Sequence, residues 1–154
     1  MDNTHMKKYV AYGIGAALVD TEIKVQDTEL AQMNIEKGLM TLVDEHRRRE
    51  LLAHLDGHLV KASHASGGSA GNSMIATAQF GGPTFMSCKV ADDGDGDIYL
   101  ADLEAAGVDH CLKSKRSSGT TGKCLVLITP DAERSMNTFL GISETLSVEQ
   151  LDPE

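Results

Sequence analysis

The sequence has few aromatic residues and little positive charge. Tryptophan is absent, aromatic residues make up 4% of the 154 positions, and 23 acidic side chains against 14 lysines and arginines give a formal net charge of −9. So few rings argue against a platform on which nucleic acid bases stack. The negative charge argues against binding to nucleic acid or to an anionic membrane surface. We therefore expect neither nucleic acids nor membranes as partners.

Cysteines are also few. Cys88, Cys111 and Cys124 form an odd, widely spaced set without a CxxC pair. This spacing predicts no zinc site and no disulfide framework, and no metal site of another kind is predicted. A reducing compartment suits such a set of thiols. We expect a cytoplasmic protein.

Long apolar runs are missing as well. Residues 6–20 read MKKYVAYGIGAALVD, which mimics a bacterial signal peptide. The apolar run stops at Asp20 without a clean A-x-A cleavage site and is far too short to span a bilayer. We interpret this segment as the first core strand instead.

What remains is typical of a globular domain. A chain of 154 residues with 41% hydrophobic and 24% charged residues can bury a real core. Strand-like and helix-like segments alternate without a repeat or a long linker, which predicts an α/β domain with a mainly parallel sheet. The expected strands are 8–12, 16–19, 22–26, 38–43, 58–62, 84–90, 109–115, 123–129 and 135–140, and the expected helices are 28–34, 44–55, 73–80, 98–107 and 143–151.

Residues 64–81, HASGGSAGNSMIATAQFG, carry the most informative pattern. They lie between the expected strand 58–62 and the expected helix 73–80, which predicts a glycine-rich turn. Glycines in such a turn allow positive φ angles and let a ligand approach the main chain. Ser69 and Asn72 add a hydroxyl and an amide beside the free N–H groups of the helix start. The alternative is an ordinary strand-to-helix turn with Asn72 or Ser73 as the N-cap.

Two phosphate-binding patterns are absent. The turn at 64–81 lacks the lysine of GxxxxGK[ST], so it is not a P-loop. A GxGxxG fingerprint that begins at Gly13 would need glycine at position 18, where the sequence has Leu18.

An acidic segment resembles a calcium-binding loop. Asp93, Asp95, Asp97 and Glu104 occupy positions 1, 3, 5 and 12 of that pattern, but Ile98 replaces the glycine needed at position 6. The following residues look helical, so we expect Asp95 or Asp97 to be the N-cap of a helix instead.

Four collinear segments together resemble the ribokinase-like (PfkB) carbohydrate kinase family, with the adenosine kinase branch as the nearest likeness. They read YGIGAALVD, GGSAGNS, ADDGDGDIYLADLEAAGVD and TGKCLVLIT, and the resemblance runs from about Tyr12 to the final residues. It implies a partial ribokinase-like three-layer α/β/α sheet domain with a small β-sheet lid. Residues 1–154 would be the N-terminal half of the kinase domain, with lid segments at about 22–43 and 109–129.

The resemblance also implies a substrate site. Asp20, Asn72 and the backbones of Gly68 and Ser69 match substrate-contacting positions of the family. A carboxylate acceptor and an amide that both donates and accepts are suited to sugar hydroxyls. Arg134 matches an arginine that adenosine kinases bring toward the transferring phosphate, and the alternative is a surface arginine on a hairpin.

The lid and the residues before Asp20 bear on the identity of the substrate. The resemblance implies that Cys124 and Val126 press on the base or the sugar. Ala16 stands where adenosine kinases carry an asparagine. The sequence therefore leaves a nucleoside and a simple sugar open as substrates.

The catalytic part of the family pattern is missing from the sequence. The resemblance implies ATP and Mg²⁺ as cofactors and a Gly-Ala-Gly-Asp segment with the general base, but no such segment occurs. We expect ATP-dependent phosphorylation of a sugar or nucleoside hydroxyl by the full-length protein and no activity from this chain alone. The alternatives are a non-catalytic ribose- or sugar-binding module and an inactive truncated product. We also expect self-association through an exposed sheet edge or the lid.

Overall fold

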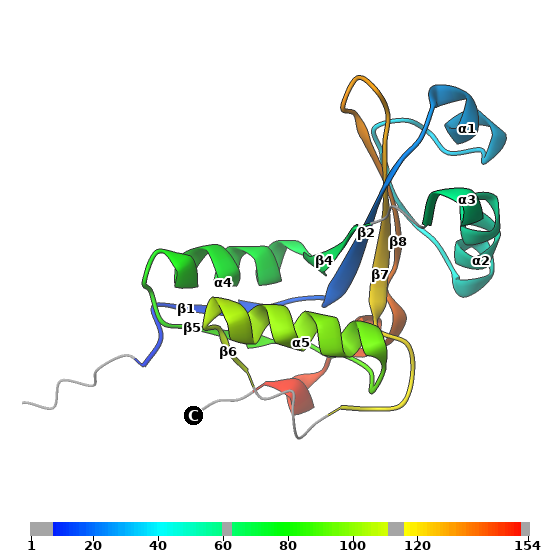
Figure 1. Cartoon of the computed structure of the whole chain (residues 1–154). Helices are drawn as coiled ribbons and strands as arrows, with labels where there is room; N and C mark the ends of the chain where they lie inside the picture. The colour runs from blue at the N-terminus through cyan, green and yellow to red at the C-terminus, as the bar shows by residue number, and fades with distance from the viewer. Residues whose placement is uncertain (1–7, 60–62, 111–115, 152–154) are drawn as a thin grey trace, which may run out of the picture.

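The computed structural model describes residues 8–59, 63–110 and 116–151. Two β-sheets stand at a steep angle to each other, and each carries helices on one side (Figure 1). The α/β class is confirmed.

The first sheet has three parallel strands in the order β1-β5-β6. These strands are β1 (Ala11–Ile14), β5 (Thr84–Ser87) and β6 (Asp109–His110). Helices α4 (Ser69–Gln79) and α5 (Gly94–Ala106) pack against it and against each other (Figure 1). Met74 from α4, Met86 from β5 and Tyr99 from α5 meet in the core between these layers. Burial of such side chains stabilises the layer by about 1.5–3 kcal/mol each.

The second sheet has five strands in the order β3-β8-β7-β2-β4, with parallel and antiparallel pairs. These strands are β2 (Leu18–Lys24), β3 (Met40–Leu42), β4 (Ser63–Gly67), β7 (Gly122–Ile128) and β8 (Arg134–Phe139). Helices α1 (Asp27–Gln32), α2 (Glu45–His54) and α3 (Asp56–Leu59) lie on one side of it (Figure 1). Ile23, Leu51 and Leu127 belong to the core that this packing encloses.

Strand β2 connects the two cores. Val19 belongs to the core of the first sheet, and Ile23, four residues further along the strand, belongs to the core of the second. The expected strands 16–19 and 22–26 are thus one strand. The predicted hairpin is confirmed, since β7 and β8 pair antiparallel.

The glycine-rich segment differs from its prediction. The expected strand 58–62 is wrong in its described part, because α3 covers Asp56–Leu59, whereas residues 60–62 lie outside the described residues. The strand is β4, which pairs with β2 through Leu18↔Gly67 to Glu22↔Ser63. Small side chains allow this close pairing, so the sequence that looked like a turn is itself a strand.

The C-terminal part differs too. The expected helix 143–151 consists of two short 3₁₀ segments, η2 (Gly141–Thr145) and η3 (Val148–Gln150). Of the expected strand 109–115, the structure describes only β6 (Asp109–His110). This strand pairs with β5 rather than with the five-stranded sheet. The predicted lid segment 109–129 is therefore divided between the two sheets, and the assignment of segments 22–43 and 109–129 as a lid stays a prediction.

None of the helices in the part of the chain that the structure describes is long and apolar enough to cross a membrane.

Two edge strands carry exposed apolar side chains. Ile14 on β1 is 56% exposed, and Met40 and Leu42 on β3 are 58% and 61% exposed. Such edges are ready to pair with another chain. We expect sedimentation velocity to show association that increases with protein concentration. Leu42→Lys should weaken this association if it occurs through β3, and Ile14→Lys should weaken it if it occurs through β1. A compact monomer at high concentration would contradict this prediction.

Candidate functional site

A cavity of about 730 Å³ lies in the angle between the two sheets. It is lined from β2, the start of α4, β7, β8 and β3. The five positions that the sequence resemblance assigned to the substrate and the phosphate line it: Asp20, Gly68, Ser69, Asn72 and Arg134. The structure therefore brings together positions that are up to 114 residues apart in the chain.

Asp20 stands near the middle of β2 with its carboxylate against the neighbouring strand. A Cβ built on Gly67 of β4 would overlap that carboxylate, so the glycine makes room for it. Partial burial raises the pKa of Asp20, Glu22 raises it further, and Arg134 acts in the opposite direction. A carboxylate in these surroundings is a strong hydrogen-bond acceptor for a ligand hydroxyl.

Gly68 sets the start of α4. Its φ of +88° is a backbone conformation that favours glycine, and an added Cβ would lie 2.7 Å from the carbonyl oxygen of Ala16. The helix begins at Ser69, four residues earlier than the sequence predicted, and no side chain caps it. Ser69 and Asn72 are exposed in its first turn and line the cavity. The helix start thus offers backbone N–H groups, a hydroxyl and an amide to a polar ligand.

Arg134 begins β8 on the same side of the sheet. It is an exposed side chain, and its guanidinium lies 3.2 Å from the carboxylate of Glu22. This pair keeps the positive charge at the rim of the cavity. Both interpretations of Arg134, as a phosphate contact and as a surface arginine, are compatible with this position.

Apolar side chains complete the walls. Met40, Leu42 and Met136 were not singled out in the sequence, although the alternation of β8 could have shown that Met136 shares a face with Thr138. Cys124 lines the cavity as expected, whereas Val126 does not. Burial raises the pKa of the Cys124 thiol, so it is protonated at neutral pH and unsuited to act as a nucleophile.

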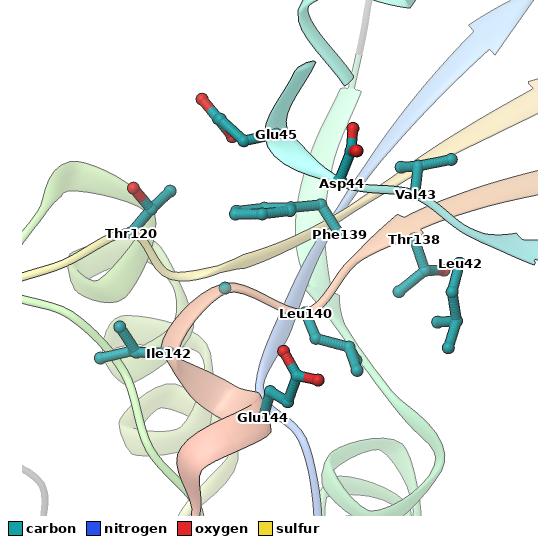
Figure 2. A pocket seen from close by; sticks show the side chains of 11 residues that line it. Leu42, Val43, Asp44, Glu45, Thr120, Thr138, Phe139, Leu140, Ile142 and Glu144 are labelled. Carbon is teal, nitrogen blue, oxygen red and sulfur yellow. The ribbon is translucent and has the colours of Figure 1, made fainter. Parts of the chain in front are cut away.

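A second cavity of about 520 Å³ adjoins the first and shares Leu42, Thr138 and Leu140 with it. Figure 2 shows Asp44 and Glu45 on one side of it and Glu144 on the other. Asp44 accepts a hydrogen bond from the backbone of Arg47 as the N-cap of α2. The hydrogen bond from Arg48 lowers the pKa of Glu45 to about 2. Two of the three carboxylates thus have structural roles in α2.

The acidic side chains at the start of α5 are paired with groups of the protein itself. The N-cap is Asp93, not Asp95 or Asp97 as predicted. Asp95 pairs with Lys123, and Asp97 lies 2.7 Å from Arg116. Carboxylates that face different partners do not form a calcium loop. Among the described residues, no group of three or more His, Cys, Asp or Glu side chains is placed to hold a metal ion.

The cavity between the sheets does not fit Mg²⁺ and ATP. Three phosphates and a metal ion need several positive groups and carboxylate ligands in one place. The cavity between the sheets presents a single arginine, which already pairs with Glu22, and a single carboxylate, Asp20. We therefore assign no binding site for ATP and Mg²⁺ to this cavity.

Comparisons with known proteins identify the family. Residues 40–154 match the model of the pfkB family carbohydrate kinases. A comparison with curated proteins gave no match. A probable sugar kinase from Rhizobium etli is 34% identical, with 96% of this chain and 43% of that chain covered and a TM-score of 0.87.

Two adenosine kinases are also similar. The enzyme from Sinorhizobium meliloti is 37% identical over 94% of this chain and 43% of that chain, with a TM-score of 0.84. The Anopheles gambiae enzyme, solved with P1,P4-di(adenosine-5) tetraphosphate, is 23% identical over 92% of this chain and 42% of that chain, with a TM-score of 0.79, and shows the shared fold. The chain spans less than half the length of these relatives. It belongs to the pfkB family of carbohydrate kinases.

Proposed function

We propose that the protein to which this chain belongs transfers a phosphoryl group from ATP to a hydroxyl of a sugar or nucleoside. We propose further that this chain supplies the part that holds the substrate. The observation that carries the proposal is the convergence of Asp20, Gly68, Ser69 and Asn72 on one cavity. The most similar solved proteins named above are a probable sugar kinase and adenosine kinases, which supports this reaction class.

The walls of the cavity suit a molecule with hydroxyls at one end and an apolar surface at the other. Asp20 accepts hydrogen bonds, and the amide of Asn72 both donates and accepts them. Met40, Leu42 and Met136 offer apolar contact to a sugar ring or a base. Both a nucleoside and a simple sugar meet this description.

Phosphoryl transfer needs more than this cavity. The reaction depends on a positioned triphosphate, metal ions and a base for the attacking hydroxyl. The sequence contains no Gly-Ala-Gly-Asp segment, and the cavity between the sheets does not fit Mg²⁺ and ATP. We therefore propose that the chain by itself binds its ligand without transferring phosphate. Its buried cysteines, Cys88 and Cys124, form no disulfide, which suits the reducing cytoplasm.

Ligand-dependent thermal stability tests the substrate site. Adenosine and ribose should each be titrated against the wild-type chain, and at least one should raise the melting temperature in a saturable way, because a ligand of the folded state stabilises it. Asp20→Asn removes the charged acceptor and should abolish the increase. Glu36→Gln, an exposed control outside the cavity, should retain it. An unchanged response in Asp20→Asn would refute the proposed site.

A product assay tests the second part of the proposal. The chain is incubated with ATP, Mg²⁺ and whichever ligand stabilises it, and the expected result is no phosphorylated product. Product formed above a protein-free control would show that the catalytic groups lie within this chain.

A further inference from the structure

A smaller cavity of about 150 Å³ lies on the other side of the five-stranded sheet, between the sheet, α2 and the start of α5. The strand register sets Asn137, Leu125, Thr21 and His64 in one row across β8, β7, β2 and β4. Paired residues share a face of a sheet, and their chain neighbours point to the opposite face. Those neighbours include residues that line the cavity proposed for the substrate. The two cavities are therefore back to back across one sheet.

Asn137 is the unusual residue of this smaller cavity. It is 4% exposed, and its Nδ2 atom has no hydrogen-bond partner among the described residues. A buried amide left without a partner is destabilising, and native proteins rarely leave one unsatisfied. An acceptor that is not part of the described chain is thus expected beside Asn137.

Of the other polar groups that line the cavity, Thr21 and His64 are hydrogen-bonded to each other at 3.1 Å, and Lys123 and Arg48 are donors. Lys123 forms an ion pair with Asp95, which leaves further ammonium protons for a ligand. The side chain of Arg48 is 15% exposed, and its Nε and Nη2 atoms donate hydrogen bonds to the carboxylate of Glu45. The lining carboxylate, Asp95, is already paired, so the cavity suits a ligand that is rich in acceptors and carries negative charge.

The remaining wall is apolar. Leu52, Leu59 and Leu125 line it, and an oxyanion such as phosphate would lose hydration against them without compensation. One water occupies about 30 Å³ of liquid, so the cavity has room for about five waters or a molecule of similar size. We propose that it binds a short-chain monocarboxylate, with the carboxylate at Asn137 and Lys123 and the hydrocarbon on the leucines.

Titration of the whole chain with sodium propionate tests this proposal. Sodium chloride and sodium phosphate at equal ionic strength serve as comparison salts, and binding is measured by calorimetry and by the melting temperature. We expect saturable binding of propionate, weaker or no binding of phosphate, and a Kd at least tenfold higher in Asn137→Leu. The loss of a charge-assisted hydrogen bond accounts for a change of this size.

Three further variants locate the site. Leu52→Phe fills the cavity without removing a polar group and should abolish binding, and it decides the question if Asn137→Leu does not fold. Leu39→Phe places the same ring at an exposed position elsewhere and should bind normally. Arg134→Gln should also bind normally, which separates this site from the cavity proposed for the substrate. The proposal is overturned if propionate acts no differently from chloride, if phosphate binds more tightly, or if Asn137→Leu and Leu52→Phe retain the wild-type affinity.

Discussion

Gly68→Ala is expected to destabilise the chain strongly and to abolish ligand binding in the cavity between the sheets. The φ of +88° and ψ of 136° at this position belong to a region that is nearly restricted to glycine, at a cost of about 1–3 kcal/mol for another residue. The added methyl group would also lie 2.7 Å from the carbonyl oxygen of Ala16. Relief of such an overlap costs a further ~1–3 kcal/mol. Urea unfolding should therefore show a total loss of about 2–6 kcal/mol.

Gly81→Ala is the matched control for this prediction. Gly81 has a φ of +87°, but an added Cβ would meet nothing within 4 Å. The control shares the positive φ but lacks the overlap, so a larger loss in Gly68→Ala is the result expected from the added contact with Ala16. Equal losses in both variants would show that this contact is unimportant, and an adenosine or ribose response retained in Gly68→Ala would argue against the geometry of the site.

Asp93→Ala is expected to cost about 3 kcal/mol, from a lost N-cap and from buried groups left without a partner. The carboxylate of Asp93 accepts hydrogen bonds from the backbone of Gly96, at 2.8 Å, and from the backbone and hydroxyl of Thr121, at 2.9 and 2.6 Å. Thr121 is fully buried, so its two donors have no access to water. The carboxylate thereby joins the start of α5 to the segment that leads into β7.

The same contacts predict a pH dependence. Burial on its own would raise the pKa of Asp93, but the hydrogen bonds from Thr121 and Gly96 and the nearby charge of Lys123 hold it below its ordinary value. A lowered pKa in the folded state means that the contribution is present above the unfolded pKa and is lost as the pH falls. The difference in unfolding free energy between wild type and Asp93→Ala should be constant near neutral pH and shrink below about pH 4.

Asp97→Ala serves as the control for Asp93→Ala. Asp97 lies in the first turn of the same helix and forms an ion pair with Arg116, in which the side chain of Asp97 is exposed. An exposed pair contributes about 0–1 kcal/mol. A loss as large as that of Asp93→Ala would mean that general charge at the helix start, rather than the bonds to Thr121, stabilises this region.

Local patterns predicted several elements because their cause is local. The apolar run KCLVLIT and the turn at Pro130-Asp131 predicted the hairpin of β7 and β8, and the stop at Gly107 marked the end of α5. The four family segments predicted which residues line the cavity, because Asp20 and the glycine-rich segment carry that chemistry in their side chains and spacing.

Other features depended on contacts between distant segments. The sequence SHASG has no strand-like alternation, and it forms β4 because its backbone pairs with β2, more than 40 residues away. Asp93 was missed as the N-cap because its advantage over Asp95 and Asp97 comes from Thr121, which no local pattern reveals. The apolar walls at Met40 and Met136 were missed for the same reason.

By itself, the sequence determined the α/β class, the family and the polar residues of the candidate site, because periodicity, glycine spacing and motif order are properties of short segments. Only the tertiary structure decided how these segments combine. It divided the strands into two sheets, set Asp20 against Gly67 and left Asn137 buried behind the same sheet. The physical reason is that strand partners and buried hydrogen bonds are chosen by the free energy of the whole packed chain, to which each local preference contributes only a small part.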